Sequence, residues 1–216
     1  AQVEGIFISH EHSDHIAGLQ QLLKRFDIPV YTKQGTWREI QDKLVVPKNQ
    51  LIELTKGSLT LGNLIVEPFA VSHDAADPIG INVFSGNDKA TVVTDTGIIS
   101  DDILHRLDDS TLLVLEANYD PHMLRFGPYQ PFLKQRVASD EGHLSNEMAA
   151  QALLMMKRPD FMQVILAHRS ENNNNAVLVT QTIGKMLVDG GVRIGPEMKL
   201  QHGQPNEIVS MQSVKR

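Results

Sequence analysis

Short hydrophobic runs alternate with polar turns along this chain, and several of the runs end at a histidine or an acidic residue. Apolar and β-branched runs bounded by turn residues predict strands. Apolar residues three and four positions apart predict helices with one buried face. The strands are expected over 3–9, 29–31, 64–72, 79–84, 90–94, 111–115 and 161–166, and near 192–210. The helices are expected over 15–26, 36–44, 100–107 and 148–156, and up to about 188.

Some segments give more specific predictions. The helix over 15–26 is expected to bury one stripe, made of Ile16, Leu19, Leu22, Leu23 and Phe26. The spacing of Thr36 and Glu39 is typical of a capping box and predicts that a helix begins there. Residues 51–71 are expected to form antiparallel strands, separated by turns at 56–57 and 62–63. The methionines of the helix over 148–156 are expected in the core, namely Met148, Met155 and Met156.

The composition favours one globular domain. The 216 residues suffice for a sizeable core, and 41% of them are hydrophobic. No apolar run approaches the roughly 18 residues that a membrane span needs, and the first residues lack the pattern of a signal peptide. The chain has no cysteine, which excludes disulfides and thiolate ligands and fits a reducing interior. We therefore expect a cytoplasmic protein with no membrane partner.

The segment His10-Glu11-His12-Ser13-Asp14-His15 places four metal-binding side chains in one turn, directly after an apolar run. Alternate residues of an extended segment share a face, so His10 and His12 point the same way, and the turn lets Asp14 and His15 converge beside them. Two imidazoles for one ion, with a carboxylate and an imidazole for the next, form the start of a two-metal site. The alternative is a solvated loop that happens to hold three histidines.

Other residues of these types stand at later strand ends. His73 follows 64–72, Asp95 follows 90–94, Glu116 ends the run after 111, and His168 follows 161–166. His143 stands just before a predicted helix, where free N–H groups favour an anion. For His73 the alternative is a capped loop histidine. For Asp95 it is a helix cap, a position that Ser100 fits better.

These segments resemble a known family. The pattern His-x-His-x-Asp-His over 10–15 is the signature of the metallo-β-lactamase superfamily. Two more segments resemble the YycJ/WalJ-like metallohydrolases, bacterial proteins regarded as nucleases, and the chain more distantly resembles tRNase Z. These segments are Val71-Ser72-His73-Asp74-Ala75-Ala76-Asp77-Pro78 and Gly142-His143-Leu144-Ser145-Asn146-Glu147.

The resemblance implies an α/β fold, the metallo-β-lactamase four-layer αβ/βα sandwich. Two mixed sheets then lie face to face with helices outside, and ligands converge from strand ends at one edge. The hydrolase domain is expected to span 1–216. Family members carry further chain before the first motif, so we expect the usual N-terminal strands to be absent, which would leave a sheet edge uncovered.

The resemblance also implies a set of ligands and roles. One divalent ion would be held by His10, His12 and His73, and the other by Asp14, His15 and His168. Asp95 would bridge the two ions, which are Zn²⁺ or Mn²⁺, with Fe²⁺ also compatible. A hydroxide between the ions would attack phosphorus, and Asp14 could also orient it. His143, hydrogen-bonded to Glu116, would assist the leaving oxygen.

Substrate contacts are expected from the segment 121–138 and from residues near the site. The segment has no clear periodicity, and its basic residues are candidates for phosphate contacts, with an ordinary solvated helix and loop as the alternative. The full set of candidates is Asn118, Arg125, Lys134, Arg136, Ser145 and Asn146. A net charge of −6 argues against a broad basic surface. Two ions would nevertheless add about four positive charges where a phosphate must lie.

The resemblance predicts a phosphodiesterase, a 5′-to-3′ exonuclease whose nucleic acid substrate is double-stranded DNA. A first alternative is a hydrolase of a small phosphodiester, thioester or lactone, which the acidic composition supports. A second is a metal-bound sensor or scaffold without turnover, against which the complete ligand set and His143 argue. The oligomeric state is left open by the sequence.

Overall fold

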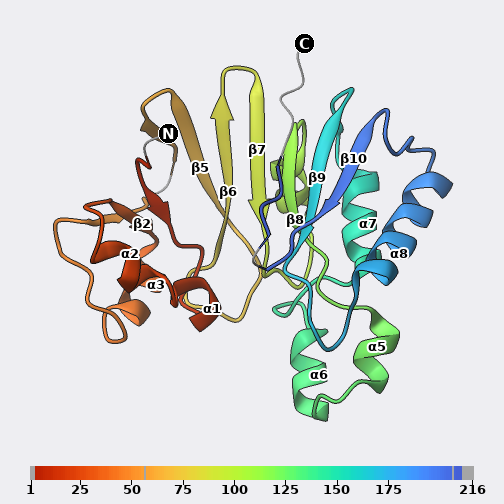
Figure 1. The fold of residues 1–216 in the computed structure, drawn as a ribbon, viewed down its shortest axis with the longest axis horizontal. Coiled ribbons are helices and arrows are strands. Elements are labelled where there is room, and N and C mark those ends of the chain that lie inside the picture. The colour runs from red at the N-terminus through yellow and green to blue at the C-terminus, as the bar shows by residue number, and fades with distance from the viewer. Residues whose placement is uncertain (1–2, 56, 206, 211–216) are drawn as a thin grey trace.

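Two β-sheets lie between layers of helices in the computed structural model, which describes residues 3–55, 57–205 and 207–210 (Figure 1). The N-terminal sheet has three strands and the other has seven. Helices α1 to α3 cover the outer face of the smaller sheet, and α4, α7 and α8 cover that of the larger one. This layering confirms the predicted α/β sandwich. Among the described residues, no helix is long and apolar enough to cross a membrane.

The smaller sheet is entirely parallel, which corrects the expectation of two mixed sheets. Its strands are β1 (Ile6–Phe7), β2 (Val30–Thr32) and β3 (Leu51–Glu53), in that order. The connections carry α1 (Ser13–Ile16), α2 (Leu19–Leu23) and α3 (Gln34–Ile40). Parallel strands need such crossovers, because the chain must return to the end of the sheet where one strand began before the next parallel strand can start.

The larger sheet is mixed, with strand order β10-β9-β8-β7-β6-β5-β4. Its antiparallel part consists of β4 (Leu59–Leu61), β5 (Leu64–Ala70), β6 (Ile79–Ser85) and β7 (Asp88–Val93). The parallel part continues from β7 through β8 (Leu112–Glu116), β9 (Met162–Ala167) and β10 (Met198–His202). Strands β6 and β7, which correspond to the strands expected over 79–84 and 90–94, form an antiparallel hairpin. One strand forms in the region where strands near 192–210 were expected.

The side-chain alternation of the strands separates the core into layers. In β2, Val30 packs against the helices of the small sheet, whereas Tyr31 packs between the two sheets with Ile79. The largest cluster lies under α4 (Asp101–Leu107), α7 (Asn146–Met155) and α8 (Ala176–Asp189), which pack on the large sheet.

Two short helices, α5 (Pro121–Phe126) and α6 (Pro131–Val137), lie beyond the edge where β7 and β8 end (Figure 1). Each has proline in its first turn, a position where the missing N–H group costs no helical hydrogen bond. The segment over 121–138 thus forms two short helices, although its sequence shows no apolar periodicity. The two helices share a small cluster of their own with Tyr119.

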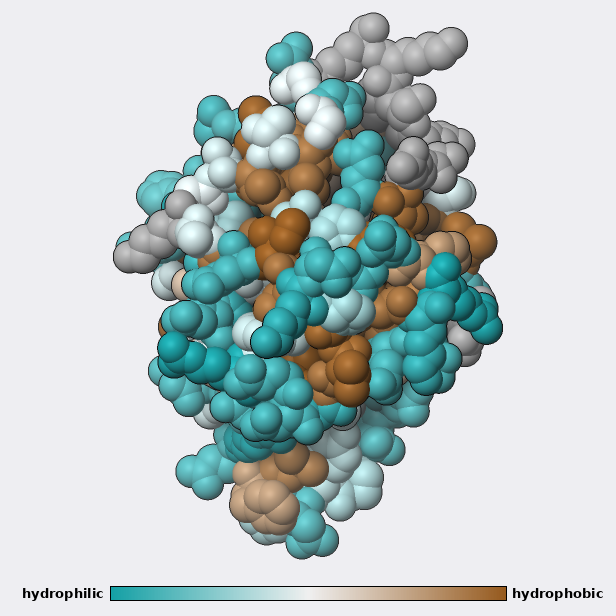
Figure 2. All heavy atoms as spheres, turned by 90° about the vertical axis from the view of Figure 1, so that its left-hand side faces the viewer, coloured by the Kyte–Doolittle hydropathy of each residue, from teal (hydrophilic) through white to brown (hydrophobic). Residues whose placement is uncertain are grey.

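The expected helix over 15–26 is two short helices separated at Ala17 and Gly18. Its stripe is only partly buried: Ile16 and Leu19 lie in the core, whereas Leu22 and Phe26 are 44% and 52% exposed. Figure 2 shows such hydrophobic side chains among hydrophilic ones on the side of the molecule that carries α2 and α3.

Three further predictions are corrected. The capping box at Thr36 is wrong, because α3 begins at Gln34 and the Thr36 hydroxyl donates to the Asp77 carbonyl at 3.2 Å. Strand β3 pairs in parallel in the small sheet, although residues 51–71 were all expected to be antiparallel. The expected turn at 56–57 includes residue 56, which lies outside the described residues. Met155 is 67% exposed, whereas Met156 is in the core as expected.

The packing of α7 gives a stability prediction. Leu153 is fully buried, so Leu153→Ala should lower the free energy of unfolding by about 2–5 kcal/mol through lost burial and a residual cavity. The matched control is Met155→Ala on the same helix, which should change it by less than about 0.5 kcal/mol. Urea unfolding followed by circular dichroism measures both, and equal losses would contradict the packing described for α7.

Candidate metal centre

The strand ends of both sheets bring the predicted ligands to one edge of the molecule. Strands β7, β8 and β9 are aligned so that Val93, Leu115 and Leu166 lie in one row. Asp95 and His168 therefore stand two residues beyond that row on either side of β8. Strand β5 runs in the same direction as β7, so the loop after it delivers its residues to the same edge.

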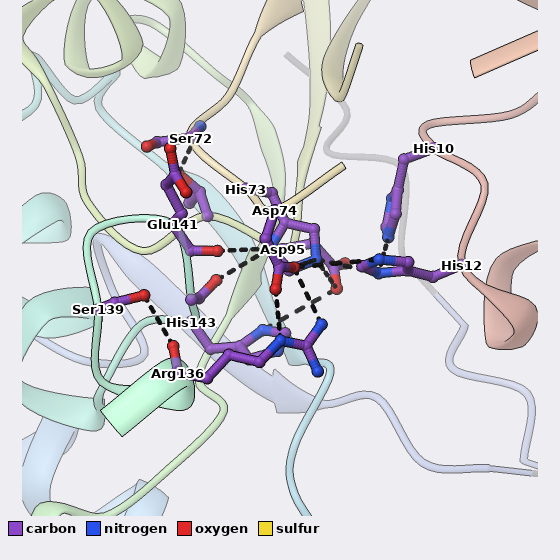
Figure 3. Close-up of polar contacts among 12 residues, drawn as sticks. His10, His12, Ser72, His73, Asp74, Asp95, Arg136, Ser139, Glu141 and His143 are labelled. Atoms are coloured by element: carbon purple, nitrogen blue, oxygen red, sulfur yellow. Dashed lines mark hydrogen bonds and ion pairs between the residues drawn. The ribbon is translucent and has the colours of Figure 1, made fainter. Parts of the chain in front are cut away.

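Three histidines form the first group. The Nε2 atom of His10 lies 3.1 Å from His12 Nδ1, and the Nε2 atom of His73 lies 3.3 Å from the same atom. His73 Nδ1 donates to the carbonyls of Glu141 and Gly142 at 3.1 Å each, which leaves Nε2 as its free ligand atom (Figure 3). Burial lowers the pKa of His73, and burial with the nearby His15 lowers that of His10 to about 3. Both rings are therefore neutral and able to bind a cation.

Asp14, His15 and His168 form the second group. Asp14 Oδ2 lies 3.5 Å from His15 Nε2 and 3.6 Å from His168 Nε2. Candidate ligand atoms within each of the two groups all lie within 4.8 Å of one another. The hydroxyl of Ser9, which the sequence did not single out, lies 3.1 Å from His10 Nδ1 and 3.2 Å from His15 Nδ1 and thereby links the two groups.

Asp95 stands between the groups. Its Oδ1 atom lies 3.4 Å from His168 Nε2 and 3.7 Å from His73 Nε2, and its Oδ2 atom lies 3.4 Å from His15 Nε2. The side chain is 3% exposed, and Oδ2 makes no hydrogen bond to the described residues. Such a buried carboxylate oxygen without a donor fits a cation, since leaving it unpaired is costly. Burial acts to raise the pKa of Asp95, but the contact with His15 and the charge of His168 outweigh it and lower the pKa.

Glu116 connects the second group to His143. Its Oε1 atom accepts from Nδ1 of His143 and from Nδ1 of His168, each at 2.7 Å. Its Oε2 atom accepts from the backbone N–H of Thr96 at 3.3 Å and of Leu144 at 3.2 Å. Although complete burial acts to raise the pKa of Glu116, the hydrogen bonds from the two histidines lower it. The carboxylate is thus ionised and fixes both rings with Nε2 toward the site.

The charge of the site favours cations. Burial acts to lower the pKa of His168, but the hydrogen bond and charge of Glu116 raise it to about 9. A pocket that stabilises positive charge on a histidine also attracts a divalent ion, which then replaces the proton. The donor set of imidazoles and carboxylates, with the unpaired oxygen of Asp95, therefore fits the divalent ions that the sequence predicts.

Three residues that were predicted to contact the substrate instead make hydrogen bonds within the protein. Asn118 Nδ2 donates to the His168 carbonyl at 2.8 Å and so holds that ligand in place. Ser145 is the N-cap of α7, where its hydroxyl accepts from the Met148 N–H. Asn146 is buried and exchanges hydrogen bonds with Asn174. Asn174 also donates to the carbonyls of residues 117 and 118. Its position in a run of asparagines gave no indication of these hydrogen bonds.

The three basic candidates differ in position. Arg136 forms an ion pair with Asp74, whose Oδ1 atom lies 3.5 Å from His73 Nε2 (Figure 3). Lys134 donates to the Arg125 carbonyl at 2.8 Å, and the Arg125 guanidinium lies over the Phe126 ring. Arg136 alone of the three therefore lies beside the ligand groups.

A cavity of about 960 Å³ opens next to the second group, within the size range of ligand pockets. Asp14, His143 and His168 line one end of it. The remaining wall comes from α6, from the loop after β9 and from residues 203–205. Arg169 and Tyr129 also line it, and the sequence analysis did not single them out.

Comparisons with known proteins agree with this geometry. The model of the beta-lactamase superfamily domain matches residues 1–168. The chain is 35% identical over 214 residues to exodeoxyribonuclease YycJ of Bacillus anthracis, covering 98% of this chain and 81% of the relative. The metallo-beta-lactamase fold protein YhfI from Bacillus subtilis superposes with a TM-score of 0.67 at 15% identity, covering 93% of this chain and 75% of that one. Human tRNase Z, short form, superposes with a TM-score of 0.53 at 20% identity, covering 77% of this chain and 73% of that one.

The family model matches well over half of the chain, and the YycJ relative matches nearly all of it. The resemblance inferred from the three motifs and the predicted fold are thereby confirmed. The chain belongs to the beta-lactamase superfamily and is a hydrolase of that superfamily.

Proposed function

We propose that this protein is a nuclease that hydrolyses phosphodiester bonds of DNA with the help of divalent metal ions. The observation that carries the proposal is the Glu116 carboxylate, which holds His168 in the second ligand group and His143 outside both. This arrangement supports a proton donor beside the proposed metal ions, as the departure of an alkoxide from phosphorus requires. The named activity of the YycJ relative, an exodeoxyribonuclease, supports DNA as the substrate.

The ligand set supports two ions. His10, His12 and His73 would hold one and Asp14, His15 and His168 the other, and Asp95 would be a ligand common to both. Zn²⁺, Mn²⁺ and Fe²⁺ all suit nitrogen and oxygen donors. Such ions supply an activated hydroxide for attack on phosphorus and offset the charge that develops there.

The chain's own residues orient the reaction and move a proton. Because His143 Nδ1 donates to Glu116, its Nε2 atom is left for the substrate, and in the imidazolium form of the ring this atom donates its proton to the leaving oxygen. Asp14, whose side chain is 64% exposed, would help to hold an ion and would orient the attacking water. Arg136 neutralises Asp74, so that carboxylate repels the substrate phosphate less.

The finer proposal is that the substrate is double-stranded DNA, degraded from the 5′ end. The test is digestion of end-labelled duplex DNA by the metal-loaded protein with Mn²⁺ or Zn²⁺, beside an Asp95→Ala control. We expect progressive shortening from the 5′ end that the variant lacks. Shortening from the 3′ end would contradict the proposed polarity and indicate a 3′-to-5′ exonuclease. Intact DNA with rapid hydrolysis of a small chromogenic phosphodiester would reassign the protein as a small-molecule phosphodiesterase.

Loss of Asp95 should remove bound metal. Asp95→Ala deletes a carboxylate that contacts histidines of both predicted ligand groups, so we expect less than one ion per chain where the wild type binds two. Mass spectrometry of the dialysed protein measures the metal content. His122→Ala, at an exposed histidine of α5, should bind as much metal as the wild type. An Asp95→Ala variant with two ions would refute the bridging role.

His143 should affect turnover without affecting metal content. His143→Ala removes the proposed proton donor, and we expect kcat to fall about 10²- to 10⁴-fold. Its metal content should equal that of the wild type, because both predicted ligand groups remain complete. If the variant instead binds one ion fewer, His143 is a ligand and the proton must come from another group.

A further inference from the structure

Arg169 is a cation that the proposed chemistry does not use. It directly follows His168, so the two Cα atoms are about 3.8 Å apart, and both residues line the cavity of about 960 Å³. The guanidinium is half-buried, and its Nη1 atom is fully buried without a hydrogen-bond partner among the described residues. An N–H group of a cation in that position normally has a partner, because leaving it unpaired is costly.

The surroundings of Arg169 contain no described acidic partner. Asp14 and Glu171 line the same cavity, yet neither forms an ion pair with Arg169 in the described part of the chain. The Arg169 charge instead acts, after burial, to lower the pKa of the nearby His202. Arg169 thus adds to the cavity lining a positive charge that no described carboxylate pairs with.

Part of the cavity wall is apolar and aromatic. Tyr129 and Leu133 line it and pack against the cluster around Tyr119 that α5 and α6 share. The Asn172 amide lies 3.5 Å from the Tyr129 hydroxyl and joins this wall to the loop that carries Arg169. A site with one unpaired guanidinium, an aromatic wall and the volume of a ligand pocket suits a nucleotide, because phosphate matches the guanidinium and a base stacks on a ring.

We propose that this cavity binds the nucleotide next to the scissile bond, with Arg169 contacting a phosphate group that is not itself cut. This rests on the proposed nuclease function and adds a subsite to it. The ligand groups bind the scissile phosphate at one end of the cavity, while Arg169 binds the neighbouring one and fixes the register of the strand.

The test compares oligonucleotides in which one phosphate at a time near the 5′ end is replaced by a neutral methylphosphonate. In the wild type, neutralising one uncut position should lower kcat/KM about ten- to a hundredfold, the range expected for a charged hydrogen bond. On the unmodified strand, Arg169→Ala should lower kcat/KM by the same factor. Neutralising that phosphate should then lower the kcat/KM of the variant no further. Arg169→Lys should recover part of the loss, since it keeps the charge but not the planar fork.

The matched control is Arg106→Ala, at an arginine of α4 that pairs with Glu67 and does not line the cavity. It should match the wild type on every strand. An Arg169→Ala variant that remains as sensitive to the neutral linkage as the wild type would overturn the proposal. So would an equal loss on a small chromogenic phosphodiester, because that loss would mean a general structural defect.

A binding measurement separates this proposal from the nuclease function. Fluorescence anisotropy of a labelled single-stranded phosphorothioate oligonucleotide, with metal-loaded protein, reports binding with little hydrolysis, because phosphorothioate linkages keep their negative charge but are cut slowly. Binding weakened about tenfold or more in Arg169→Ala, but not in Arg106→Ala, supports the subsite even if the wild type cuts no DNA. Equal binding by the wild type and Arg169→Ala, or no binding by either, overturns it.

Discussion

The buried carboxylate of Glu116 is the interaction on which the site depends. An ionised carboxylate without contact to water is stable only when its oxygens are fully hydrogen-bonded, and Glu116 accepts four such bonds. The donors come from the ends of β7 and β9 and from the loop before α7. One charge therefore joins three segments that are distant in sequence, and it sets which nitrogen of each histidine faces the site.

The backbone is strained at the residues that this arrangement places. Asp95 and His168 have φ angles of 56° and 51°, in the left-handed region that residues other than glycine rarely adopt. Each such residue costs about 1–3 kcal/mol and persists only where its surroundings determine it. The aligned ends of β7, β8 and β9 supply that constraint. The strain turns Asp95 and His168 out of the strand direction and toward each other, where a shared cation would lie.

The convergence of these side chains could be predicted from the sequence because the position of each is set locally. A histidine or aspartate that directly follows a buried strand is placed by that strand, and the shared direction of the strands places it beside the others, as with His73 and Asp95. Helical structure over 121–138 was predicted only as an alternative, since the burial of α5 and α6 is slight and their signal is a proline in each first turn. Arg169 and Asn174 were not predicted either. Their roles depend on which distant segments the fold brings to them, and residue spacing carries no such information.

The acidic composition is compatible with a phosphate-binding site once charge is considered locally. The net charge of −6 is a property of the whole chain, whereas charges more than about 8 Å apart on the surface are largely screened at physiological salt. Near the ligand groups Asp74 is paired with Arg136, and Glu116 accepts hydrogen bonds from two histidines. In the proposed function, Asp14 and Asp95 would be neutralised by the metal ions, and the charge left to meet a substrate would be that of the ions and Arg169, which is positive. The proposed function therefore does not need a broad basic surface.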